Sequence, residues 1–205
     1  MKKIPFYPNH KDGMYCVLAV YRSLYDYFFD EKLSFKQLEK KSRAEKNKGV
    51  WHLLLDSDLA SRGVDIVNIE TIDYQKLFEE KGEYLKKLYD HQTAEYYLTQ
   101  TNITKLFDVI PQYLKSVHHI TKLATIDDID SLLSKGYIIG AEVNSRILNN
   151  KPGFSLHYVL IQKGDQNSYI MHDPGLPPIE NRKVSREDIE KSLANEVSGF
   201  KLGLV

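Results

Sequence analysis

The spacing of the apolar residues changes just past the middle of the chain. Before Lys115 they recur every three or four residues, which is the period of an amphipathic helix. After it come three β-rich runs, residues 137–148, 155–162 and 168–172, separated by turn-forming residues. Such runs pair as antiparallel strands. The sequence therefore predicts an α+β fold, with a helical front half and an antiparallel sheet in the back half.

The front half is predicted to be mostly helical. Its segments are, in chain order, a helix over residues 12–29, a helix over 50–60, a strand over 64–69 and two or three helices over 72–117. Asp12 is the expected N-cap of the first helix, and Gly63 closes the second. Gly82 and Pro111 are the expected breaks in the long helical segment.

The back half contains further end signals beside the three strands. A strand over 119–124 is followed by Thr125 and Asp128, which form an acidic capping box before a helix that ends at Gly136. Ser185 is expected to cap a short helix that runs to about residue 194, before a final strand over 200–205. At 205 residues the chain suits a single domain, residues 1–205, that includes the helical segment at about 72–117.

The charges of the chain balance. Lys and Arg number 28, and Asp and Glu number 28, so the formal net charge is zero. A dedicated binder of nucleic acid or of an anionic membrane needs a basic excess, so neither partner is expected. No run approaches the roughly 18 apolar residues of a membrane span. The start, Met1-Lys2-Lys3, lacks the apolar segment of a signal peptide, and we expect a soluble, cytoplasmic protein.

The chain has one cysteine, Cys16. An internal disulfide is impossible, which agrees with a reducing compartment. Cys16 lies in the first turn or so of the predicted first helix, where the helix dipole favours a thiolate. The plainer interpretation is a small buried apolar residue, since free cysteine is among the most buried residue types.

Two residues of the back half suggest partners for this thiol. His157 interrupts an apolar strand, and Asp173 ends the next one. A hairpin turning near residues 164–167 brings positions 157 and 173 close to opposite each other, so a carboxylate and an imidazole meet across neighbouring strands. A cysteine nucleophile needs such an oriented imidazole. His157 taken alone is equally compatible with a core histidine.

No metal or other cofactor is expected. His118 and His119 are adjacent and point to opposite faces of a strand. The spacing of His52, His91 and His172 is not that of zinc ligands.

The three segments around these residues resemble a known family. They are Gly13-Met14-Tyr15-Cys16-Val17-Leu18-Ala19, His157-Tyr158-Val159-Leu160-Ile161 and Asp173-Pro174-Gly175. They are similar to the papain-like cysteine peptidases, and most to the bacteriocin-processing (double-glycine) peptidase-like group. The run 182–188 also resembles that family's closing helix. The resemblance covers both ends of the chain and leaves about residues 65–120 unaccounted for.

The resemblance implies the papain-like cysteine proteinase fold and a role for each residue. Cys16 would be the nucleophile, His157 the general acid and base, and Asp173 the orienting group. Two positions depart from the family pattern: Val17 replaces a glycine, and His10 replaces a glutamine that helps to hold the oxyanion. His10 or the neighbouring Asn9, together with the Cys16 backbone N–H, are the candidates for that role.

The sequence thus predicts a cysteine hydrolase that cleaves an amide or peptide bond through a thioester acyl-enzyme. Two alternatives stay open. With an amine as acceptor, the same site would be an acyltransferase. The departures at positions 17 and 10 are compatible with a catalytically silent, peptide-binding module. The expected partner is a peptide or amide substrate, and neither its identity nor the oligomeric state follows from the sequence.

Overall fold

The centre of the fold is a seven-stranded sheet in the computed structural model, which describes residues 2–11 and 13–203. Its strands are β1 (Val64–Glu70), β2 (His118–Thr121), β3 (Ile138–Asn144), β4 (Leu156–Gly164), β5 (Ser168–Asp173), β6 (Ile179–Ser185) and β7 (Leu193–Leu202). Their order is β2-β1-β7-β3-β4-β5-β6, and only β1 and β2 pair in parallel. The predicted α+β class is confirmed, but β1 of the front half also joins the sheet, and β2 lies beside it at the edge.

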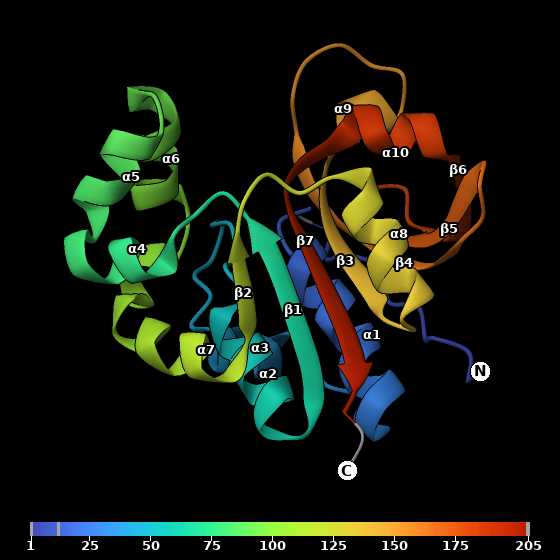
Figure 1. Cartoon of the computed structure of the whole chain (residues 1–205), viewed down its shortest axis with the longest axis horizontal. Coiled ribbons are helices and arrows are strands. Elements are labelled where there is room, and N and C mark those ends of the chain that lie inside the picture. The colour runs from blue at the N-terminus through green and yellow to red at the C-terminus, as the bar shows by residue number, and fades with distance from the viewer. Residues whose placement is uncertain (1, 12, 204–205) are drawn as a thin grey trace.

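Helices lie on both faces of the sheet and beside its β2 edge (Figure 1). The α-helices of the described residues are α1 (Cys16–Phe29), α2 (Phe35–Ser42), α3 (Leu53–Ser61), α4 (Tyr74–Glu80), α5 (Gly82–Leu88), α6 (His91–Gln100), α7 (Ile110–Ser116), α8 (Ile126–Ser134), α9 (Ser145–Leu148) and α10 (Arg186–Ser192). Helix α1 packs on one face, against β4, and α8 on the other, against β3, β4 and β7. No helix in the described part of the chain is both long and apolar enough to cross a membrane.

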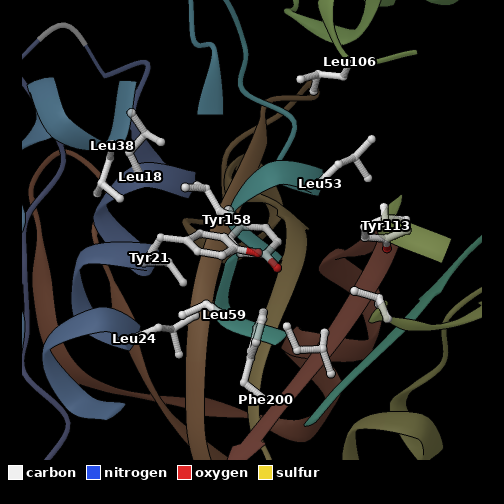
Figure 2. Packing of buried hydrophobic residues seen from close by; sticks show 14 of the residues in the cluster. Leu18, Tyr21, Leu24, Leu38, Leu53, Leu59, Leu106, Tyr113, Tyr158 and Phe200 are labelled. Atoms are coloured by element: carbon white, nitrogen blue, oxygen red, sulfur yellow. The ribbon is translucent and has the colours of Figure 1, made fainter. Parts of the chain in front are cut away.

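Two apolar clusters hold these layers together, one on each face of the sheet. On the α1 face, Leu24, Tyr158 and Phe200 belong to a fully buried cluster that joins α1 to β4 and β7 (Figure 2). On the other face, Ile129 of α8 and Val159 of β4 belong to the second cluster. Because side chains alternate along a strand, neighbouring residues of β4 serve different clusters.

The first helix begins at Cys16, four residues later than predicted. Gly13 has a left-handed backbone, with φ +78°, which breaks the helical path. The Asn9 side chain then accepts a hydrogen bond from the Tyr15 backbone N–H at 2.8 Å, which fixes the loop before the helix. The predicted N-cap, Asp12, lies outside the described residues. The consequence is that Cys16 is the first residue of the helix rather than part of its first turns.

The segment 72–117 contains four α-helices, α4 to α7, and two short 3₁₀ turns, so the prediction of two or three helices was too low. The predicted breaks are confirmed: α5 begins at Gly82, and Pro111 lies in the first turn of α7. The second predicted helix, 50–60, is α3 and begins at Leu53; Gly63 follows it with φ +91°.

The capping signals of the back half are confirmed, whereas several boundaries are not. Thr125 and Asp128 form the capping box of α8, and the Ser185 side chain accepts from the Asp188 N–H at the start of α10. Helix α10 ends at Ser192, and the last strand begins at residue 193 rather than 200; residues 204–205 lie outside the described residues. The run 182–188 is only partly helical, since its first four residues belong to β6.

Candidate active site

Cys16 is half-buried at the N-terminus of α1. Backbone N–H groups at this end lack partners inside the helix, and they favour a negative charge. The His157 side chain and the backbone of Tyr158 and Val17 hydrogen-bond to the thiol. Burial opposes ionisation, but these partners outweigh it and lower the pKa of the Cys16 thiol. This is the environment of a reactive cysteine.

His157 lies near the start of β4, and its side chain is buried between Cys16 and Asp173. Its Nε2 is 2.8 Å from Asp173 Oδ1, so Nδ1 is the ring nitrogen left for the thiol. Burial disfavours the imidazolium. The hydrogen bonds and charges of Asp173 and Cys16 nevertheless raise the pKa of His157 to about 10. A lowered thiol pKa beside a raised imidazole pKa favours a thiolate–imidazolium pair at neutral pH.

Asp173 ends β5 and accepts three hydrogen bonds. Beside the bond from His157, its Oδ1 accepts the Gly175 backbone N–H at 2.9 Å, and its Oδ2 accepts Arg182 Nη1 at 2.7 Å. Burial alone would raise the pKa of this carboxyl. The partners outweigh it and lower the pKa of Asp173 to about 2. An ionised carboxylate on Nε2 fixes the ring orientation and stabilises the imidazolium.

The hairpin brings His157 and Asp173 together, but not in the predicted register. Leu160 pairs with His172, and a bulge follows between Ile161 and Lys163. Residues 157 and 173 are therefore not directly opposite, and their side chains meet diagonally. The contact was predicted from the hairpin midpoint, whereas the bulge had no sequence signal.

The two oxyanion candidates occupy different places. Asn9 lines a cavity beside His157; its Oδ1 accepts the N–H groups of His10 and Tyr15, each at 2.8 Å, and its Nδ2 donates to Gly13 O at 3.0 Å. His10 is exposed, and its ring packs on those of Tyr15 and Phe35, at centroid distances of 5.7 and 5.9 Å. The position of Asn9 suits a donor at the site better than that of His10.

The cavity beside His157 and Asp173 has a volume of about 380 Å³. Ser145, Lys151 and Leu176 contribute to its wall. A methyl group placed on Gly13 would lie 3.6 Å from Leu176 Cδ1, so the turn after Asp173 crosses close to the loop before Cys16. A volume of this size can hold one or two residues of a peptide beside His157.

Sequence reasoning did not find Arg182, or Glu142, which lies within electrostatic range of Cys16. Arg182 lies on β6, which has no alternating apolar pattern. It becomes recognisable only when the fold places its guanidinium on Asp173 and on the Leu148 carbonyl. Within residues 2–11 and 13–203, no group of three or more His, Cys, Asp or Glu is arranged to hold a metal ion.

The helix with a half-buried cysteine, packed against a sheet that carries a histidine, defines the papain-like peptidase fold that the sequence predicted. Among solved structures, the chain is similar to the peptidase domain of Streptococcus ComA, described as a bi-functional ABC transporter involved in a quorum sensing pathway. The match covers 97% of this chain and 98% of that one, with a TM-score of 0.53 and 14% sequence identity. At this identity the likeness concerns the fold. No family model matches the chain, and no curated protein does either.

Proposed function

We propose that this chain is a cysteine hydrolase that cleaves a peptide or amide bond with Cys16, His157 and Asp173. The observation that carries the proposal is the continuous chain of contacts from the Cys16 thiol through His157 to Asp173, with its lowered thiol pKa and raised imidazole pKa. The likeness of the fold to a peptidase domain supports a peptide as the substrate.

The reaction follows from the protonation states of this pair. The Cys16 thiolate attacks the substrate carbonyl, and the developing oxyanion is held by the Cys16 backbone N–H with Asn9 as the second donor. The His157 imidazolium then gives its proton to the leaving amine as the carbon–nitrogen bond breaks. Water, deprotonated by His157, cleaves the thioester and releases the acid. Asp173 keeps the imidazole oriented throughout.

The single cysteine agrees with a reducing compartment, so a cytoplasmic location is part of the proposal.

The first test is the pH dependence of Cys16 alkylation by iodoacetamide. The lowered thiol pKa and the His157 pKa of about 10 favour the ion pair near neutral pH; acid protonates the thiolate, and a pH above about 10 deprotonates the imidazolium. We expect rapid alkylation below pH 7 in the wild type. We expect His157→Ala to need the higher pH of an ordinary thiol, whose pKa is about 8.5. Equal profiles for the two proteins would contradict the proposal.

Turnover is tested separately, with a mixed peptide library and mass spectrometry of its products. Peptides cut by the wild type and left intact by Cys16→Ala establish hydrolysis. Adding an amino-acid amide, whose amine is an ordinary nucleophile, separates hydrolysis from acyl transfer: ligated amide products in place of free acids, at an amine concentration far below that of water, indicate an acyltransferase. A fast-reacting Cys16 that cuts no member of a broad library would favour the silent peptide-binding module.

A further inference from the structure

Three adjacent strands each place a carboxyl group on the α1 face of the sheet. In the register, Val197 of β7 pairs with Ile69 of β1 on one side and with Ala141 of β3 on the other. Ile69, Ala141 and Val197 belong to the cluster on the opposite face. Because side chains alternate, the residue after Ile69, the one before Val197 and the one after Ala141 point to the α1 face. These residues are Glu70, Glu196 and Glu142, which we call the acidic row.

Among the residues that the structure describes, a cation is bonded to only one member of the acidic row, Glu196. His52 Nε2 lies 2.8 Å from Glu196 Oε1, and the other nitrogen of His52 is held by Asp56 at 2.7 Å. Glu70 is 96% buried; Tyr74 hydrogen-bonds to it, but its Oε1 has no hydrogen-bond partner. A buried oxygen without a hydrogen-bond partner is costly unless a ligand or a water molecule satisfies it.

The two carboxyls without a bonded cation resist ionisation. Burial, followed by the charge of Glu196, raises the pKa of Glu70 well above its ordinary value and that of Glu142 to about 8. The charge of His52 lowers the pKa of both carboxyls, but it offsets the rise only in part. A positive group brought close to both would remove the repulsion and allow them to ionise.

Three tyrosines of the middle helices lie within electrostatic range of the same carboxyls. The charge of Glu142 acts on Tyr89, Tyr96 and Tyr97, and that of Glu70 acts on Tyr89 and Tyr97. The ring centroids of Tyr97 and its two neighbours are 5.1 and 5.9 Å apart. Aromatic faces together with a carboxyl group are the chemistry that recognises an organic cation.

Two of these residues, Glu142 and Tyr96, lie within electrostatic range of Cys16. Glu142 is half-buried and pairs across the strands with Tyr158, the residue whose backbone hydrogen-bonds to Cys16. Tyr96 itself is exposed. A substrate chain bound at Cys16 would therefore come within electrostatic range of Glu142.

We propose that Glu142 and Glu70, with Tyr89, Tyr96 and Tyr97, form a subsite for the cationic end of a lysine or arginine side chain within two residues of the scissile bond. The inference rests on the proposed function, since it names the substrate class of that same site. It also gives the middle helices a role, because α6 supplies two of the tyrosines.

The test uses peptide chloromethyl ketones, which form a bond from Cys16 sulfur to carbon with loss of chloride and need no turnover. Two series place the variable residue next to the reactive group or one position further away. In each, lysine is compared with norleucine, which keeps the chain length without the charge, and with glutamate. We expect at least one lysine probe to inactivate the wild type roughly tenfold faster than its norleucine partner. Glutamate is expected to be the slowest.

The lysine-to-norleucine ratio is then measured in two variants. It should fall toward one in Glu142→Gln and persist in Glu190→Gln, a matched control at an exposed residue of α10. Suppose that norleucine probes inactivate the wild type well and that lysine probes are no faster in either series. That result would overturn this inference and leave the proposed function standing. If no peptide probe inactivates the wild type faster than the same probe reacts with a simple thiol, the proposed function itself is contradicted.

Discussion

Gly175 shows how closely single residues are fitted around the candidate site. A methyl group at this position would lie 2.9 Å from Asp173 Oδ1 and 3.3 Å from His157 Nε2. Contacts this short at a side chain already held by three hydrogen bonds cannot be relieved without moving the carboxylate. The glycine of the Asp-Pro-Gly turn is thus required by the packing around the imidazole rather than by a left-handed backbone.

We predict that Gly175→Ala impairs the ion pair while leaving the fold intact. The added methyl displaces Asp173 from Nε2, so the imidazolium loses its partner and the thiolate fraction falls. Misplacements of this kind cost one to two orders of magnitude, and we expect alkylation of Cys16 at pH 6 to slow roughly tenfold or more. The measurement is the iodoacetamide rate, with an unchanged circular dichroism spectrum as the control. A rate within twofold of the wild type would contradict the prediction.

At the scale of secondary structure, the sequence predicted most elements that have strong apolar periodicity, but it missed α2 although Ser34 and Gln37 form a capping box at its start. The Thr125–Asp128 box and the hairpin of β4 and β5 were found because their residues have specific backbone chemistry. The short helix α2 buries only Leu38 and Ser42, and β6 lies at the sheet edge with mostly exposed residues. Neither has a buried face that a periodicity could reveal.

The missed strand β6 supplies a positioning residue. Arg182 holds Asp173 Oδ2 with one nitrogen and the Leu148 carbonyl with the other. We predict that Arg182→Gln raises the pKa of Asp173, weakens its hold on His157 and moves the acid limb of Cys16 alkylation to higher pH. Arg182→Lys keeps the charge, so the pH of its acid limb should lie between those of the wild type and Arg182→Gln. Arg146→Gln, at an exposed position of α9, is the matched control. A loss of stability with no movement of the pH profile would mean that Arg182 is only structural.

Across the whole molecule, a buried ionic group joins the helical front half to the sheet. His52, at the N-terminus of α3, bonds to Asp56 of the same helix and to Glu196 of β7, and all three side chains are buried. Asn68 of β1 donates to the same carboxylate at 3.1 Å. Composition and spacing could not predict this group, since its members are up to 144 residues apart and share no motif. Only the crossing of β7 between β1 and β3 brings them together.

This group should carry much of the stability that connects the two halves. Burial opposes charge on His52, but Glu196 and Asp56 raise its pKa well above the ordinary value. A raised folded-state pKa stabilises the fold fully below about pH 6.5, and the contribution is lost as the pH rises through the folded-state value.

We therefore predict that His52→Gln, which leaves two buried carboxylates without their cation, lowers the free energy of unfolding by about 3–5 kcal/mol at pH 6. The deficit should narrow at alkaline pH, because the wild-type histidine then also loses its charge. Urea unfolding between pH 6 and 9.5 measures the size of the deficit and its change with pH. His91→Gln, at an exposed residue of α6, is the matched control. A deficit that stays below about 1 kcal/mol at pH 6 would mean that the carboxylates take up protons at little cost, and that apolar packing alone joins α3 to the sheet.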